Sequence, residues 1–68
     1  MTLYEYLQKE ADERALMFTE LAQKIGVAHN TLYQTRRRKP SLTTYRKIAN
    51  YLNIDVIELR KYPIKEWH

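Results

Sequence analysis

The stretch of sequence that decides the fold is residues 20–32, ELAQKIGVAHNTL. Within it, Ala22, Gly26 and Leu32 stand at a spacing that suits two helices joined by a sharp turn. Ala22 is small enough for a second helix to cross close to it, and Gly26 can adopt the left-handed conformation of the turn. Leu32 anchors the second helix on the first. The spacing therefore predicts a steeply angled helix pair whose second helix presents a fixed outward face.

A capping box marks the beginning of an earlier helix. Thr2 and Glu5 are three residues apart, so each side chain can satisfy a free backbone N–H group of the other residue. Apolar residues follow at helical spacing, which predicts a helix from this box to about residues 12–14. A second helix is expected over about 18–25, where Gly26 ends it.

The third helix, which is the second of the pair, is expected over about 28–37. Its apolar residues Leu32 and Tyr33, with Val27 just before it, are expected to face inward. Three polar side chains then lie near its start and on its outward side: His29, Asn30 and Gln34.

Two further helices are expected after a basic loop. Ser41 is the expected N-cap of a fourth helix, and Asn53 suits its left-handed C-cap. The buried stripe of this helix is expected to contain Leu42, Tyr45, Ile48, Ala49 and Leu52. Asp55 and Glu58 form a second capping box, which opens a short fifth helix that Pro63 ends. Because no strand-like alternation occurs, the sequence predicts an all-α domain of five short helices around one core.

Length and composition restrict the class of protein further. The 68 residues allow one domain, and the absence of cysteine excludes disulfides and thiolate zinc sites. No apolar run approaches the roughly 20 residues that span a bilayer, and no signal-peptide pattern opens the chain. We therefore expect a soluble cytoplasmic protein that does not enter a membrane.

The net charge of +4 is distributed unevenly along the chain. Residues 1–20 hold two basic and five acidic side chains, whereas residues 21–47 hold seven basic and no acidic ones. A segment with one sign of charge is typical of proteins that bind a polyanion, although a solvated basic face would have the same composition.

Other chemistries find little support in the sequence. His29 and His68 are far apart and have no further ligands at metal-binding spacing, so no metal site is expected. One glycine cannot build a phosphate-cradling loop, and the acidic residues near the N-terminus are typical of a solvated helix face. We expect neither an enzyme nor a cofactor, and no small-molecule substrate is evident.

Three segments carry a resemblance to a known family: ELAQKIGV at residues 20–27, KPSL at 39–42 and IANYLNI at 48–54. They are similar to E-L-A-x-K-[IVL]-G-V, K-P-S-L and I-A-x-x-L-G-V of the Cro/phage-repressor type (XRE-like) helix-turn-helix DNA-binding family. The resemblance covers about residues 3–60. It implies a lambda-repressor-like domain that places its recognition helix, about 28–37, in the major groove of duplex DNA. It also implies a sequence-specific transcriptional regulator, with a repressor as the expectation.

The resemblance also implies roles for individual residues. Base-reading positions fall on His29, Asn30 and Gln34, and Asn and Gln side chains can pair bidentately with adenine. Backbone phosphates are the expected partners of Arg36, Arg37, Arg38, Lys39 and Ser41. The chain departs from the family at Met17 and Phe18, which replace a capping Ser or Thr and a phosphate-binding Gln. Thr19 is expected to take over that phosphate contact, and Thr35 replaces an apolar core residue.

A homodimer on a palindromic operator is the expected working species, because one recognition helix reads only a few base pairs. Residues 1–62 would form the DNA-binding domain, and the apolar tail 63–68 would supply the dimer contact. In the alternative, Tyr62 and Trp67 fold back over the domain's own core. A different class of function also stays open, namely a helical protein-interaction module, such as an antitoxin-like protein that binds a partner.

Overall fold

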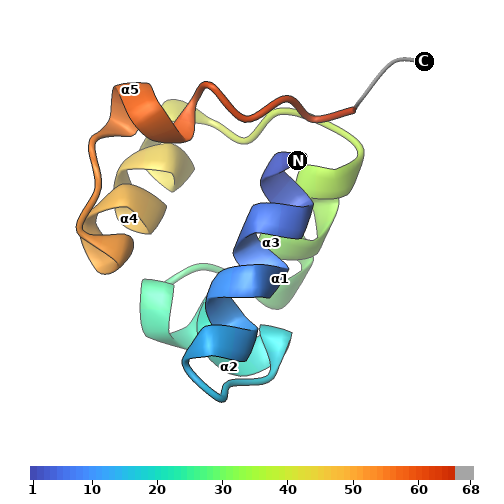
Figure 1. Cartoon of the computed structure of the whole chain (residues 1–68), viewed down its shortest axis with the longest axis vertical. Coiled ribbons are helices and arrows are strands. Elements are labelled where there is room, and N and C mark those ends of the chain that lie inside the picture. The colour runs from blue at the N-terminus through green and yellow to red at the C-terminus, as the bar shows by residue number, and fades with distance from the viewer. Residues whose placement is uncertain (66–68) are drawn as a thin grey trace.

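The computed structural model describes residues 1–65 of the chain. Its elements are α1 (Leu3–Glu13), α2 (Phe18–Ile25), α3 (His29–Tyr33), the 3-10 helix η1 (Gln34–Arg36), α4 (Leu42–Leu52) and α5 (Val56–Leu59) (Figure 1). No strand occurs within residues 1–65, and the predicted all-α fold of five short helices is confirmed. No helix in the same range has the length and apolar character needed to cross a bilayer.

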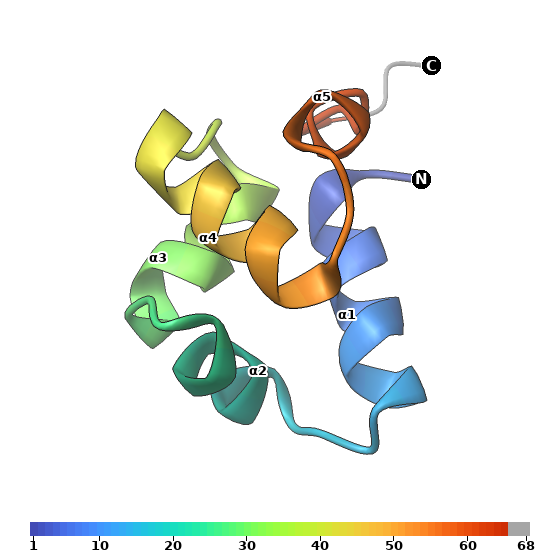
Figure 2. The same cartoon turned by 90° about the vertical axis from the view of Figure 1, so that its left-hand side faces the viewer.

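One core collects an apolar stripe from each helix. The stripes consist of Leu3, Leu7 and Ala11 from α1, Leu21, Ala22 and Ile25 from α2, Leu32 from α3, Tyr45, Ile48, Ala49 and Leu52 from α4, and Leu59 from α5. Figure 2 shows α2 and α3 together at one corner of the molecule, joined by their sharp turn. Because Leu32 is fully buried, α3 cannot rotate without opening the core, and its outward face is fixed.

The turn between α2 and α3 has the predicted geometry. Gly26 has φ +93°, and its N–H donates to the carbonyl of Ala22 at 2.9 Å, which is the left-handed helix ending expected of glycine. A Cβ atom at Gly26 would meet nothing within 4 Å. The backbone conformation, and not a lack of space, therefore requires glycine at this position.

Most predicted helix ends are confirmed. The Thr2 N–H donates to Glu5 Oε1 at 2.8 Å and the Glu5 N–H to Thr2 Oγ1 at 3.2 Å, so the capping box of α1 is complete. Ser41 Oγ caps α4 by accepting from the N–H of Thr44, and Asn53 ends this helix at φ +58°. The second capping box was predicted wrongly. Asp55 accepts from the N–H of Ile57, but Glu58 is an exposed residue whose carboxylate pairs with Lys61 at 3.1 Å.

Two residues predicted to be buried lie at the surface. Leu42 is 48% exposed, because it stands in the first turn of α4, where Thr44 instead faces the interior. Tyr33 is 38% exposed, because its ring packs sideways against Tyr4 and Phe18 at the rim of the core, with ring centroids 5.7 and 6.3 Å away.

The C-terminal segment returns to the start of the chain (Figure 1). The Pro63 carbonyl accepts a hydrogen bond from the N–H of Leu3 at 2.9 Å. The Tyr62 ring stacks on that of Tyr6 at 4.3 Å between centroids, and Ile64 packs against the core. Tyr62 therefore folds back over the domain, as the alternative interpretation expected, whereas Trp67 lies outside the described residues.

Candidate nucleic-acid interface

The predicted recognition helix is shorter in the structure than the sequence indicates. Only His29–Tyr33 is α-helical, and the chain continues as the 3-10 turn Gln34–Arg36, so the prediction of one helix over 28–37 was wrong. Thr35 is 1% exposed, and its hydroxyl donates to the carbonyl of Leu32 at 2.7 Å. This side chain satisfies a carbonyl three residues back, which suits the tighter 3-10 winding. Thr35 thus occupies an apolar position without leaving its own hydroxyl unpaired.

The predicted base-reading residues are all exposed, but they do not form one group. Asn30 and Gln34 line an open hollow of about 490 Å³, together with Tyr33, Arg36, Arg37 and Arg38. His29 does not line this hollow, and its ring lies against Tyr33 at 5.5 Å between centroids. The structure therefore brings two of the three predicted base-reading residues together with three arginines.

The segment 36–39, which we call the basic loop, consists of four exposed cations: Arg36, Arg37, Arg38 and Lys39. Ion pairs within residues 1–65 join Lys9 to Glu13, Arg14 to Glu10 and Lys61 to Glu58, and none of them involves the loop. Two loop side chains have other partners: the Arg36 guanidinium lies 4.6 Å from the Tyr33 ring centroid, and Arg38 donates to Gln34. The positive charge of the loop is consequently available to an external anion.

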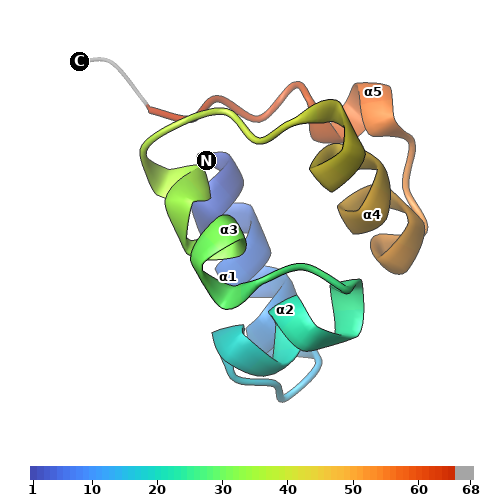
Figure 3. The same cartoon turned by 180° about the vertical axis from the view of Figure 1, so that it is seen from behind.

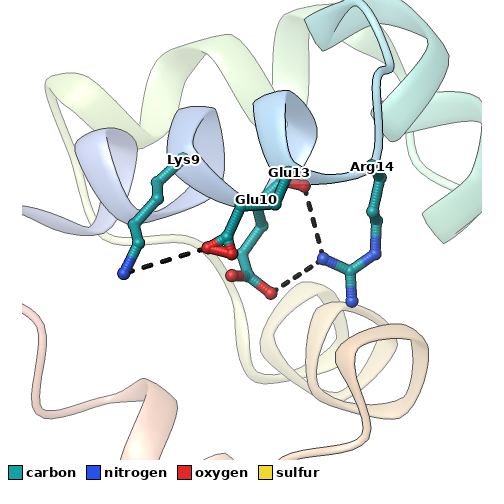
Figure 4. A network of polar contacts seen from close by, with 4 residues as sticks. All are labelled: Lys9, Glu10, Glu13 and Arg14. Atoms are coloured by element: carbon teal, nitrogen blue, oxygen red, sulfur yellow. Dashed lines mark hydrogen bonds and ion pairs between the residues drawn. The ribbon is translucent and has the colours of Figure 1, made fainter.

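Carboxylates of the acidic helix α1 pair with the two cations nearest to them in the sequence, Lys9 and Arg14. Figure 4 shows Arg14 donating to Glu10 Oε1 at 2.8 Å and to the Glu10 carbonyl at 3.3 Å, while Lys9 lies 3.9 Å from Glu13. These i,i+4 pairs join Lys9 of α1 and Arg14, the C-cap residue of this helix, to carboxylates of α1. The uncompensated positive charge therefore lies in the middle of the chain and not at its start.

The first turn of α4 adjoins the basic loop. A hollow of about 270 Å³ joins Ser41 and Thr44 to the loop and to the recognition segment, with the remaining lining from Thr31, Gln34, Arg38, Lys39 and Pro40. The hydroxyls of Ser41 and Thr44 lie 3.2 Å apart. Gln34 and Arg38 line both hollows, so the predicted base-reading and phosphate-binding sets meet at these two residues.

The first turn of α2 was predicted to supply a phosphate contact through Thr19. Met17 provides no side-chain cap, and Glu20 Oε1 accepts from its N–H at 2.9 Å. Phe18 packs on Tyr4 with centroids 5.1 Å apart. Thr19 is exposed, and it lines neither of the two hollows that contain the other predicted phosphate-binding residues.

Sequence reasoning missed one cation. Lys65 lines a hollow of about 440 Å³ with Pro63, Ile64 and three residues of the basic loop, Arg37, Arg38 and Lys39. Figure 3 shows the loop after η1 and the C-terminal segment running side by side across one end of the molecule. No sequence signal links residues 37–39 to residue 65, because the pairing depends on the return of the chain to α1.

Comparison with known proteins identifies the family. Neither curated proteins nor solved structures gave a match to the chain. The family model described as Cro/C1-type HTH DNA-binding domain matches residues 6–64, which is most of the chain and includes the α2–α3 pair, the basic loop and α4. Within residues 1–65 no three His, Cys, Asp or Glu side chains are grouped to hold a metal ion. The chain belongs to the Cro/C1-type helix-turn-helix DNA-binding family.

Proposed function

We propose that the protein is a sequence-specific, duplex-DNA-binding transcriptional regulator in the cytoplasm and that it acts as a repressor. The observation that carries this proposal is the basic loop, whose four cations form no ion pair with any other residue among 1–65 and begin at the last residue of η1, which follows α3. A polyanion placed against the loop would also meet the exposed polar side chains of α3. The major groove, about 12 Å wide, admits a helix of this kind.

The roles divide between base edges and phosphates. His29, Asn30 and Gln34 contact base edges, because they are exposed on α3 and at the start of η1. The basic loop and Ser41, which both precede the first residue of α4, contact backbone phosphates. Thr19 remains a candidate phosphate ligand on separate ground, since it stands in the first turn of α2.

A protein-interaction module is the competing function. Such a module would present an exposed apolar groove on the surface that binds its partner. Within residues 1–65 the large exposed apolar side chains are Met1, Met17, Tyr33, Leu42 and Ile57. Tyr33 alone among them lies on α3, and Arg36 lies over its ring, so the polar and cationic character of this surface favours DNA.

We further propose that the protein binds a palindromic operator as a homodimer. Two recognition helices would lie about 34–36 Å apart, one helical turn of DNA. The dimer contact lies in the C-terminal part of the chain, where Ile57 is 67% exposed on α5 and Trp67 adds an aromatic side chain. Aromatic and apolar residues are enriched at the centres of interfaces.

Selection of binding sites from random duplexes at stated salt concentrations tests the proposed function. We expect a defined preferred site and a log–log salt slope of about −0.9 for each phosphate neutralised. A binding constant that does not change between low and physiological salt would contradict the proposal. Binding of an acidic protein with equal affinity would favour the competing function.

Sedimentation of truncated chains tests the dimer. Deletion of 63–68 also removes the Pro63 carbonyl that bonds to Leu3, so the cleaner variant lacks 66–68 only. We expect the shorter deletion, or Ile57→Asp, to give a monomer that binds a palindrome weakly. If both variants remain dimers and bind cooperatively, the contact lies elsewhere.

A further inference from the structure

Gln34 and Arg38 form a bidentate side-chain contact one turn apart. Gln34 Oε1 accepts from Arg38 Nε at 2.9 Å and from Arg38 Nη2 at 2.5 Å. Both donors belong to one edge of the guanidinium, so they approach Gln34 Oε1 from the same side and hold this oxygen against Arg38. The amide nitrogen is then the group that Gln34 offers to a base.

The backbone holds this contact in place. The N–H groups of Arg37 and Arg38 both donate to the Gln34 carbonyl, at 2.9 and 3.0 Å. These bonds close the chain around Gln34 and set Arg38 directly over it. The planar guanidinium then meets the amide with two parallel donors, an arrangement that lysine cannot reproduce.

The polar groups that the pair leaves without a partner within residues 1–65 are donors. Gln34 keeps the two N–H groups of its amide nitrogen, and Arg38 keeps the N–H groups of Nη1 and one of Nη2. In the major groove guanine presents two acceptors, O6 and N7, whereas adenine presents one acceptor and one donor. A donor-only surface matches guanine fully, leaves the adenine N6 amino group unmatched and opposes the cytosine amino group.

We propose that Arg38 fixes Gln34 as a donor-only reader and so selects guanine at the base pair that Gln34 faces. This inference rests on the proposed function, and it replaces the expectation that Gln34 pairs bidentately with adenine. Arg38 is then a positioning residue for specificity, in addition to its contact with phosphate through Nη1. Arg37, its neighbour in the basic loop, donates no side-chain hydrogen bond within residues 1–65 and serves as the matched control.

The test selects sites from random duplexes with the unsubstituted chain and with Gln34→Ala, Arg38→Ala, Arg38→Lys and Arg37→Ala. Loss of preference in Gln34→Ala identifies the base pair in question. There we expect the unsubstituted chain to favour guanine over adenine by about tenfold or more, within the usual discrimination of one bidentate pair. Arg38→Ala frees Gln34 Oε1 and is expected to shift this ratio at least about tenfold toward adenine.

The two control variants separate the effect of the arginine charge from the effect of the contact between Arg38 and Gln34 Oε1. Arg38→Lys keeps the charge and the salt slope but cannot hold Gln34 Oε1 with two donors of one planar group, so it too should lose the guanine preference. Arg37→Ala should weaken all duplexes alike and keep guanine. Thermal melting of each variant checks that the fold persists.

Three results would overturn the inference alone: selection of adenine by the unsubstituted chain, unchanged guanine preference in Arg38→Ala, or a Gln34→Ala variant that alters no position. Absence of salt-dependent duplex binding by the unsubstituted chain would instead overturn the proposed function, and the inference with it.

Discussion

α2 begins before the recognition segment and α4 begins after it, and the residues at the two helix starts have opposite chemical character. α4 begins with the Ser41 hydroxyl, next to Lys39 and Pro40 in one hollow. α2 begins with Met17, which provides no side-chain cap, and with Phe18, whose ring packs on Tyr4. One start is polar and bordered by cations, and the other is covered by aromatic rings.

The difference indicates that the starts of α2 and α4 have different functions. Free N–H groups and the positive end of the helix dipole favour an anion at any helix start, but only where the anion can approach and cations assist. The α4 start meets both conditions. At the α2 start, Phe18 joins Tyr4 and Tyr33 and thereby ties α1 and α3 to α2. We infer that α4 and the basic loop bind the DNA backbone, while the α2 start holds the recognition helix in place.

The largest expected effect is on DNA affinity. The double variant Arg37→Ala, Lys39→Ala should bind all duplexes more weakly and flatten the log–log salt slope by about 1.8, which corresponds to two lost phosphate contacts. Thr19→Ala should leave the slope unchanged, because no charge is lost. Titration of one duplex at several salt concentrations measures both. A larger loss of affinity in Thr19→Ala than in the double variant would reverse the proposed division.

The second effect concerns the stability of the aromatic corner, the cluster of Tyr4, Phe18 and Tyr33. Phe18→Gln should destabilise the domain by about 2 kcal/mol, because a half-buried ring and its contact with Tyr4 are lost. Chemical denaturation measures this loss. Phe18→Leu is the control, since it keeps apolar contact and should lose about half as much. If Phe18→Gln is as stable as the unsubstituted chain, the corner contributes little.

The helices and the core were largely predictable from sequence, because helical spacing and caps are local signals. Thr2 with Glu5, Gly26 and Asn53 mark helix ends with side chains or conformations that few other residues supply. The boundary between α3 and η1 was not predictable. It depends on Thr35, whose burial under α1 and hydrogen bond to the Leu32 carbonyl are consequences of packing.

The composition of the candidate site was predictable, but its internal contacts were not. Sequence placed His29, Asn30 and Gln34 on an exposed surface and the arginines after it, and these residues are exposed. It could not show that His29 lies against Tyr33 or that Arg38 occupies the Gln34 oxygen. Both contacts depend on how the chain closes after Tyr33. The position of Lys65 beside the basic loop depends on the return of the C-terminal segment, which no local pattern encodes.

A smaller effect tests the two caps directly. Met17→Ser introduces a hydroxyl at an uncapped N-cap and should stabilise the domain by about 1 kcal/mol, whereas Ser41→Ala should destabilise it by a similar amount. In a domain of this size 1 kcal/mol shifts the melting temperature by roughly 4–8 °C. Thermal melts of the two variants and of the double variant give the comparison. Equal and opposite shifts that cancel in the double variant are expected; a Met17→Ser variant that melts lower would mean that Glu20 already satisfies this start.

The smallest effect is a pH dependence at a third helix start, that of α1. Hydrogen bonds from Thr2, first from its backbone N–H, hold the pKa of the Glu5 carboxyl below its ordinary value. A lowered pKa in the folded state means that the stabilisation is present above the ordinary glutamate pKa of about 4.3 and is lost as the pH falls through the lower, folded value. The Glu5→Gln variant should therefore lose less stability between pH 7 and pH 3 than the unsubstituted chain. Urea denaturation at the two pH values measures the difference. Glu13→Gln removes the same charge at the other end of α1, outside the capping box. If it reduces the pH dependence as much as Glu5→Gln does, net charge and not the capping box accounts for the effect.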